Sequence, residues 1–174
     1  MTKTTLRGMT AALVLMAGLG TAGAQDSTNV VATQGDWTVF AAESPKECWA
    51  VSAPKATQNT DENGAPREVT RGDIRLYVAY RSGENGAVSF SGGYPFAPDS
   101  TVEVDVGGSK FNLFTEGETA WPGTEADDEK LIGALRGGTN AVITGRSSRG
   151  TVTKDTFSLA GVTAATNTAR ERCQ

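Results

Sequence analysis

The sequence predicts a mainly β protein, an antiparallel β-sandwich or a partly closed barrel, with two short helices. Three observations predict this class. About eight or nine short segments alternate apolar and polar residues with a period of two. Turns rich in glycine separate these segments, and the chain contains 21 glycines. Helical character is confined to 125–136 and 162–173. Many short strands joined by such turns are typical of sandwiches and barrels.

The hairpin over 101–114 carries the clearest strand signal. Three valines alternate with two carboxylates from 102 to 106, so the valines share one face of a strand. Gly107-Gly108 follows, and both central positions of a type I′ turn require a positive φ. Apolar residues return on the same face over 109–114. This pattern predicts two antiparallel strands with one wet face.

The other strands are expected, in chain order, at 37–41, 48–53, 73–81, 87–91, 117–121, 141–147 and 151–159. The tryptophans in or beside them, Trp37, Trp49 and Trp121, are expected in the core. In the last strand Val152 is out of phase with Phe157, which predicts a β-bulge near 154–155. Residues 55–72 are polar around the turn dipeptide Asn63-Gly64, so we expect a projecting hairpin or a mobile loop there.

Each predicted helix has end signals of its own. Thr124 stands at the cap position of 125–136, acidic residues fill the first turn, and Gly137-Gly138 ends the apolar stripe. The alanine-rich segment 162–173 ends with Arg170 and Arg172, which suit the negative end of a helix dipole.

The first 24 residues have the pattern of a cleaved signal peptide. Lys3 and Arg7 precede a short apolar run at 11–19, and small residues at 22–24 suit a signal peptidase. That run is shorter than the roughly 20 residues of a spanning helix, although a retained N-terminal anchor is the alternative. We therefore expect secretion, a flexible N-terminus at 25–34, one domain at 35–174, and no transmembrane segment after cleavage.

Charge and cysteine content fit a secreted chain. The net charge is −4, and cleavage would remove two further positive charges, so nucleic acid is not an expected partner. The chain has two cysteines, Cys48 and Cys173. In an oxidising compartment a disulfide between them is favoured over two free thiols. A structural clasp is favoured over a redox role, because redox pairs usually lie close in sequence.

The residue types available restrict the chemistry. The chain contains no histidine, which excludes Ser-His-Asp and Cys-His nucleophile systems and every zinc site with a histidine ligand. We therefore expect neither a metal nor a cofactor, and no enzyme activity. One alternative is a carboxylate-based hydrolase or lyase that uses Glu116, Glu118 or Asp128; Glu116 and Glu118 would point to the same side of an extended segment. A carrier for a small apolar ligand is the other alternative.

Four residues are candidates for binding a partner. Tyr94 and Phe96 lie in a loop stiffened by two prolines, where they would either anchor a partner or plug the open end of the sandwich; we favour the plug. Arg146 and Arg149 lie at a predicted hairpin tip, where they would hold a carboxylate or phosphate or remain solvated turn residues.

Several motifs together point to a family. They are Gly35-Asp36-Trp37, Cys48-Trp49-Ala50-Val51, Gly92-Gly93-Tyr94-Pro95, Phe111-Asn112-Leu113-Phe114, Gly145-Arg146-Ser147, and Lys154-Asp155-Thr156-Phe157-Ser158-Leu159 followed by Gly161-Val162-Thr163-Ala164-Ala165 and a terminal cysteine. In these motifs the chain resembles the invasion-associated locus B family of Gram-negative envelope proteins. The resemblance implies an immunoglobulin-like β-sandwich, a periplasmic or envelope location and pairing of Cys48 with Cys173. It supplies no catalytic motif. We therefore expect a non-enzymatic binding module for a protein or cell-surface partner.

Overall fold

The computed structural model describes residues 29–174, which form eleven strands and two helices. The elements are β1 (Val30–Gln34), β2 (Trp37–Glu43), β3 (Lys46–Ser52), β4 (Ala56–Thr60), β5 (Arg75–Arg81), β6 (Ala87–Ser91), β7 (Thr101–Val106), β8 (Ser109–Glu116), β9 (Thr119–Trp121), α1 (Glu125–Gly137), β10 (Asn140–Arg146), β11 (Val152–Ser158) and α2 (Val162–Cys173). The signal peptide predicted at 1–24 lies outside the described residues.

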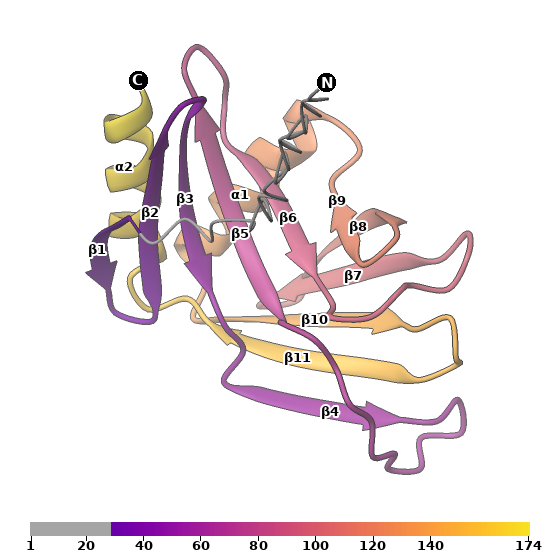
Figure 1. Ribbon diagram of the computed structural model, residues 1–174. Coiled ribbons are helices and arrows are strands. Elements are labelled where there is room, and N and C mark those ends of the chain that lie inside the picture. The colour runs from indigo at the N-terminus through magenta and orange to yellow at the C-terminus, as the bar shows by residue number, and fades with distance from the viewer. Residues whose placement is uncertain (1–28) are drawn as a thin grey trace, which may run out of the picture.

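All strands belong to one antiparallel sheet in the order β1-β2-β3-β5-β6-β9-β8-β7-β10-β11-β4. Figure 1 shows that the sheet folds over: β2, β3, β5 and β6 run upright, whereas β7, β10, β11 and β4 run across the lower part of the molecule. The inner faces of the two halves meet, as Phe90 on β6 and Phe157 on β11 pack edge to face with centroids 6.1 Å apart. The predicted mainly β fold with two helices is confirmed.

The core follows the period of two along each strand. The largest fully buried side chains include Trp37, Phe90 and Phe157. The indole of Trp37 donates to the Ser158 carbonyl, which ties β2 to the end of β11. Trp49 and Trp121 were expected in the core, and that prediction is wrong. Their chain neighbours face inward, so alternation along the strand places both tryptophans half-buried on the outer face.

The two helices cover the inner face of the upright strands. The Thr124 hydroxyl caps α1 by accepting the N–H of Asp127, and Leu131 and Leu135 bury the apolar side of this helix against β6. α2 packs on β2, β3 and β5 through its small residues. Close packing is visible at Gly161, just before α2, where an added Cβ would lie 1.9 Å from the backbone oxygen of Gln34.

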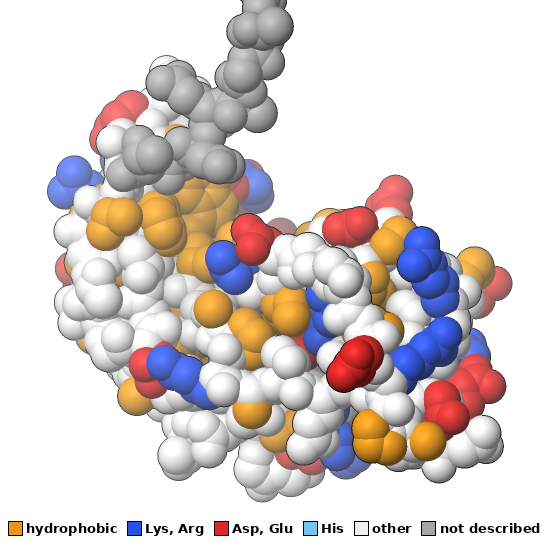
Figure 2. Space-filling model, turned by 60° about the horizontal axis from the view of Figure 1, so that its bottom comes forward, with side chains coloured by type: hydrophobic (Ala, Val, Ile, Leu, Met, Phe, Trp, Pro, Cys, Tyr) orange, Lys and Arg blue, Asp and Glu red, His pale blue; other side chains and the backbone are white. Residues whose placement is uncertain are grey.

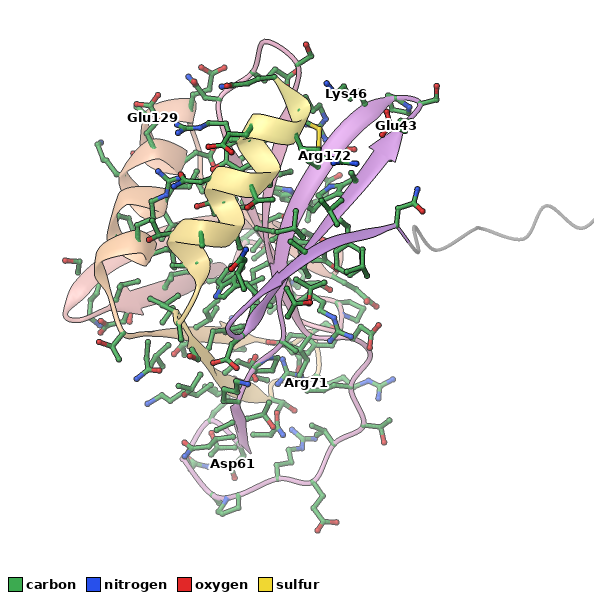
Figure 3. The ribbon with its side chains drawn as sticks, turned by 90° about the vertical axis from the view of Figure 1, so that its left-hand side faces the viewer. Glu43, Lys46, Asp61, Arg71, Glu129 and Arg172 are labelled. Carbon is green, nitrogen blue, oxygen red and sulfur yellow. A yellow bond between two sulfur atoms is a disulfide. The ribbon has the colours of Figure 1, made fainter. Side chains whose placement is uncertain are left out.

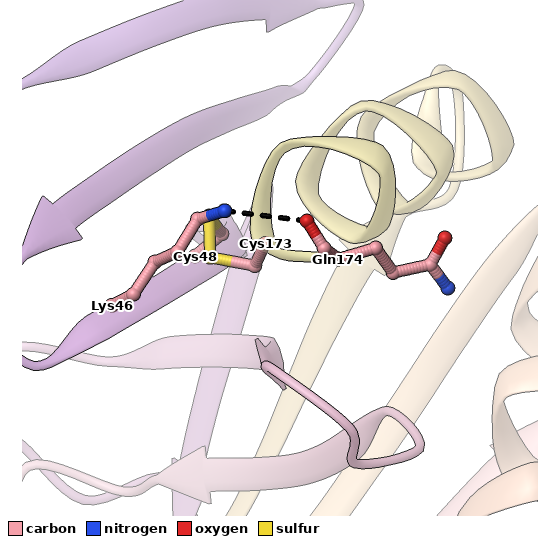
Figure 4. Close-up of a disulfide and its surroundings, with 4 residues drawn as sticks. All are labelled: Lys46, Cys48, Cys173 and Gln174. Carbon is pink, nitrogen blue, oxygen red and sulfur yellow. Dashed lines mark hydrogen bonds between the residues drawn. A yellow bond between two sulfur atoms is a disulfide. The ribbon is translucent and has the colours of Figure 1, made fainter.

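A disulfide joins the end of α2 to β3 (Figure 4), as predicted. Cys48 and Cys173 are 125 residues apart in sequence, and their Cα atoms lie 5.9 Å apart. The Lys46 ammonium donates to the Gln174 carbonyl over 3.3 Å beside it. These contacts hold the chain terminus against the sheet.

Two local expectations differ from the structure. Residues 30–34 of the supposed flexible N-terminus form β1, because their backbone pairs with β2 although their side chains are partly exposed. The bulge predicted near 154–155 is absent: β10 and β11 pair without interruption from Asn140 with Ser158 to Arg146 with Val152. Val152 is out of phase because the inward positions before Phe157 hold two polar residues, Thr153 and Asp155.

Candidate functional site

A cleft of about 530 Å³ lies at the end of the molecule where β11 meets three loops. We call it the arginine cleft. Its lining comes from 67–71, 93–95, Glu118, 147–149, Thr151 and Thr153. Figure 2, which brings this end forward, shows basic side chains beside acidic ones on this surface.

Backbone pairing fixes the outer wall of the arginine cleft. β4 pairs with β11 at the edge of the sheet, and the chain then turns at 61–65, where the Asp61 carboxylate accepts the N–H groups of Asn63 and Ala65. On its return, Arg67 N donates to the Asn59 carbonyl over 2.9 Å. The turn predicted at Asn63-Gly64 is therefore present, and the segment is an ordered part of the sheet edge rather than a mobile loop.

An arginine that the sequence did not single out holds this wall to the core. Arg71 makes a bidentate ion pair with Asp155, with Nη1–Oδ1 and Nη2–Oδ2 distances of 2.8 and 2.7 Å. It also donates twice to the Gly92 carbonyl, at 3.0 and 2.8 Å. The side chains of Arg71 and Asp155 are 6% and 0% exposed. In Figure 3 Arg71 lies close to the body of the molecule, whereas Asp61 lies farther out on the projecting segment.

Burial sets the electrostatics of this pair. Removal of water raises the pKa of Asp155, and the hydrogen bonds from Arg71 partly offset this effect by favouring the charged carboxylate. The fork of the guanidinium matches both carboxylate oxygens, a geometry that a lysine cannot reproduce. The pair thus joins 67–71, the 92–98 loop and β11 into one unit.

Tyr94 forms the floor of the cleft, and Phe96 lies beneath it. The Tyr94 hydroxyl is 2.6 Å from the Thr153 hydroxyl. The guanidinium carbon of Arg71 lies 4.9 Å from the centroid of the Tyr94 ring. Burial raises the pKa of the Tyr94 phenol. Phe96 is 6% exposed and packs on Tyr94 and Phe90. Phe96 therefore closes the end of the sandwich, and its ring is not at the surface.

The two arginines of the hairpin tip have different surroundings. Arg149 is exposed and lines the cleft, and its carbonyl accepts from the Arg67 guanidinium over 3.3 Å. Arg146 is also exposed, but it pairs with Glu62 at 3.2 Å and is not part of the cleft lining. Arg67 is the second exposed arginine of the cleft. Sequence reasoning missed it, because only the pairing of 66–67 with β4 carries it next to Arg149.

The three carboxylates suggested for acid–base chemistry do not meet. Asp128 accepts the N–H of Val88 over 2.6 Å, and burial there raises the pKa of its carboxyl. Gly117 and Glu118 form the turn between β8 and β9, so Glu116 and Glu118 do not share an extended segment as predicted. Glu118 alone of the three lines the cleft.

Acidic residues near the start of α1 take part in capping and local pairing. The Thr124 hydroxyl and Lys130 bind the Asp127 carboxylate and lower its pKa. Within residues 29–174 no group of three or more acidic, cysteine or histidine side chains is arranged to hold a metal ion. No helix in the same range is long and apolar enough to cross a membrane.

The lining of the arginine cleft therefore includes two exposed guanidinium groups, two glutamates and Tyr94, and the buried Arg71–Asp155 ion pair supports it. Guanidinium groups bind carboxylates through paired hydrogen bonds, so the two arginines suit an acidic group on a partner, whereas the two glutamates suit a basic one.

Comparison with known proteins places this chain in a family. Residues 37–170 match the model of the family described as "Invasion associated locus B (IalB) protein". The chain belongs to the IalB family. No curated protein matches it. Among solved structures, the invasion associated protein B from Bartonella henselae is similar, with a TM-score of 0.54 and 16% sequence identity over 79% of this chain and 94% of that one. At this identity the likeness concerns the fold, and it agrees with the IalB β-sandwich that the motifs implied.

Proposed function

We propose that this IalB protein is secreted to the periplasm or cell envelope, where it is a non-enzymatic binding module whose arginine cleft takes an acidic group of a protein or cell-surface partner. The disulfide between Cys48 and Cys173 supports an extracytoplasmic location, since such bonds persist in oxidising compartments. The family and the Bartonella protein are named for an association with invasion. The proposal for this chain is limited to binding.

The contact between Arg67 and Arg149 in the cleft lining carries the proposal. Both side chains are exposed, and the bond from the Arg67 guanidinium to the Arg149 carbonyl brings these two residues next to each other in the cleft lining. The walls are held by the buried Arg71–Asp155 ion pair, so a partner meets a site that is already ordered. A preformed site loses less conformational entropy on binding, which leaves more of the interaction energy as affinity.

One observation favours an alternative. Glu68 and Glu118 both line the arginine cleft, so it contains a pair of carboxylates of the kind that a histidine-free hydrolase or lyase would need. Replacing Glu118 by glutamine separates the two functions. A binding module keeps its partner when this charge is lost, whereas a carboxylate enzyme loses turnover and keeps its substrate.

The test is chemical crosslinking in intact cells followed by purification of the tagged protein. The test variant combines Arg67→Ala, Arg149→Ala and Tyr94→Ala, and the control is Arg146→Ala, which removes an arginine outside the cleft. We expect one recurrent envelope component with the wild-type chain and the control, and its loss with the triple variant. Equal capture by the triple variant would move the site elsewhere, and no capture by the wild-type chain would contradict the binding function.

A further inference from the structure

A second hollow lies on the outer face of the sheet, on the side away from the helices. It has a volume of about 520 Å³ and extends over β3, β5, β6 and β9. We call it the tryptophan groove, because Trp49, Tyr77 and Trp121 form its aromatic walls. In Figure 2 hydrophobic side chains gather in the upper part of the view, where this face of the sheet lies. The arginine cleft shares no lining residue with it.

The pairing of the strands explains why this face is hollow. Trp49 lies opposite Ala79, and Ala79 lies opposite Ala87, so two alanines form a low floor beside a large ring. Tyr77 lies opposite Ser89 in the next row. Two strand spacings separate β5 from β9, so the backbone of Tyr77 and that of Trp121 lie roughly 10 Å apart.

Phe114 extends the aromatic wall beyond the groove. Its ring centroid lies 5.5 Å from that of Trp121 on the paired strand β9, and 49% of Phe114 is exposed. A large exposed aromatic beside a half-buried one indicates a surface that continues past the hollow, as an extended ligand would require.

The groove also contains hydrogen-bonding groups that the fold does not use. The indole N–H groups of Trp49 and Trp121 have no acceptor within residues 29–174, in contrast to the core tryptophan, whose N–H reaches a backbone carbonyl. Within the same residues the hydroxyls of Ser89 and Thr119 make no hydrogen bond, whereas the neighbouring Ser91 donates to a backbone carbonyl. An ion pair of Glu47 with Arg81 borders one end.

We propose that the tryptophan groove binds a glycan built from pyranose units. A pyranose presents a C–H face that stacks on an aromatic ring and a rim of hydroxyls that both donate and accept hydrogen bonds. The groove supplies rings on its walls and unused indole and hydroxyl groups between them. This site is separate from the arginine cleft, so a negative result for glycan binding would not contradict the proposed function.

Two other occupants fit less well. An apolar peptide carries hydrogen-bonding groups only along its backbone, so it would leave more of the free N–H and O–H groups without partners than a sugar does, and each such burial opposes binding. A second copy of the chain would place one hollow against another, and the space between them would lack the close packing of a stable interface.

The test is titration of the purified protein with three trisaccharides of different linkage: cellotriose, maltotriose and triacetylchitotriose. Calorimetry measures affinity, and tryptophan fluorescence reports the site, since Trp49 and Trp121 line the groove and Trp37 is fully buried. The variants are Trp121→Ala and Tyr77→Ala, and the control is Tyr94→Ala in the arginine cleft. Circular dichroism verifies the fold of each variant, and sedimentation velocity measures self-association.

We expect saturable binding of at least one trisaccharide and about a tenfold loss of affinity in each groove variant, the size of one aromatic contact. The control should bind as wild type does. The proposal is overturned if none of the three sugars binds, or if Tyr94→Ala abolishes binding while the groove variants retain it. A dimer that dissociates in Trp121→Ala would also overturn it, because a second copy would then occupy the groove.

Discussion

Replacing Arg71 by alanine should destabilise the whole protein, although this residue lies in a segment that looks like a surface loop. The substitution leaves the carboxylate of Asp155 without a partner at a position that is 0% exposed. Breaking one side of a buried ion pair costs about 3–5 kcal/mol of unfolding free energy. We expect this cost to be global, because Asp155 lies in β11 beside Phe157 at the centre of the core.

Arg75→Ala provides a matched control. Arg75 pairs with Asp73 at 3.5 Å, but 35% of the arginine and 87% of the aspartate side chain are exposed. Exposed pairs of this kind contribute about 0–1 kcal/mol. Arg71→Lys should fall between the two alanine variants, because lysine keeps the charge and loses the two-pronged contact with Asp155.

Urea unfolding followed by tryptophan fluorescence measures these differences through the midpoint and the slope. The double variant Arg71→Met with Asp155→Leu should be less destabilised than Arg71→Ala, since it leaves no buried charge. If Arg71→Ala shifts the midpoint no more than Arg75→Ala does, the ion pair does not hold the cleft wall to the core, and the account of this site is wrong.

Three further predictions concern the disulfide, the tyrosines and the helices. Cys173→Ala should lower the free energy of unfolding by up to about 5 kcal/mol, because its bond to Cys48 closes a long loop; reduction of the wild-type protein should match it in a denaturant titration. Burial raises the pKa of all three tyrosines above 10.0, so neutral phenols stabilise the fold below that pH, and the contribution is lost as the pH rises through their folded-state pKa values. Phenolate absorbance should therefore rise later in folded than in urea-unfolded protein, and Tyr94→Phe should remove one late step. Gly161→Ala should lower the melting temperature strongly, because its Cβ would clash with the backbone at the end of β1. Gly133→Ala, on the open side of α1, should instead increase the free energy of unfolding by about 0.5–1 kcal/mol and so raise the melting temperature.

Alternation of apolar and polar residues accounts for most of what the sequence predicts correctly. It places the hairpin at 101–114, the strand carrying Leu76 and Val78, and both helices, because each of these buries an apolar face. The same rule fails where an inward position is polar. Asp155 has the same spacing parity as Phe157, so it occupies an inward position and its charge is buried. The rule expects an apolar residue at that position and therefore predicts a bulge instead.

The candidate site was less accessible to prediction, because its parts come from distant segments. Arg71 and Asp155 are 84 residues apart, and nothing local indicates that they meet. β4 carries polar side chains and is held by backbone pairing, so hydrophobicity does not reveal it. Trp49 was assigned to the core because it lies in a strand, whereas alternation along β3 turns its side chain to the outer face.

Site-specific photocrosslinking tests the binding function most directly. A photoreactive amino acid at Ser148, which lines the arginine cleft, is compared in intact cells with one at Glu171, which is exposed on α2. We expect a discrete crosslinked product from position 148 that disappears with Arg67→Ala and Arg149→Ala, and none from position 171. Products of the same size from both positions, or a product at 148 that survives loss of both arginines, would contradict a partner bound in the arginine cleft.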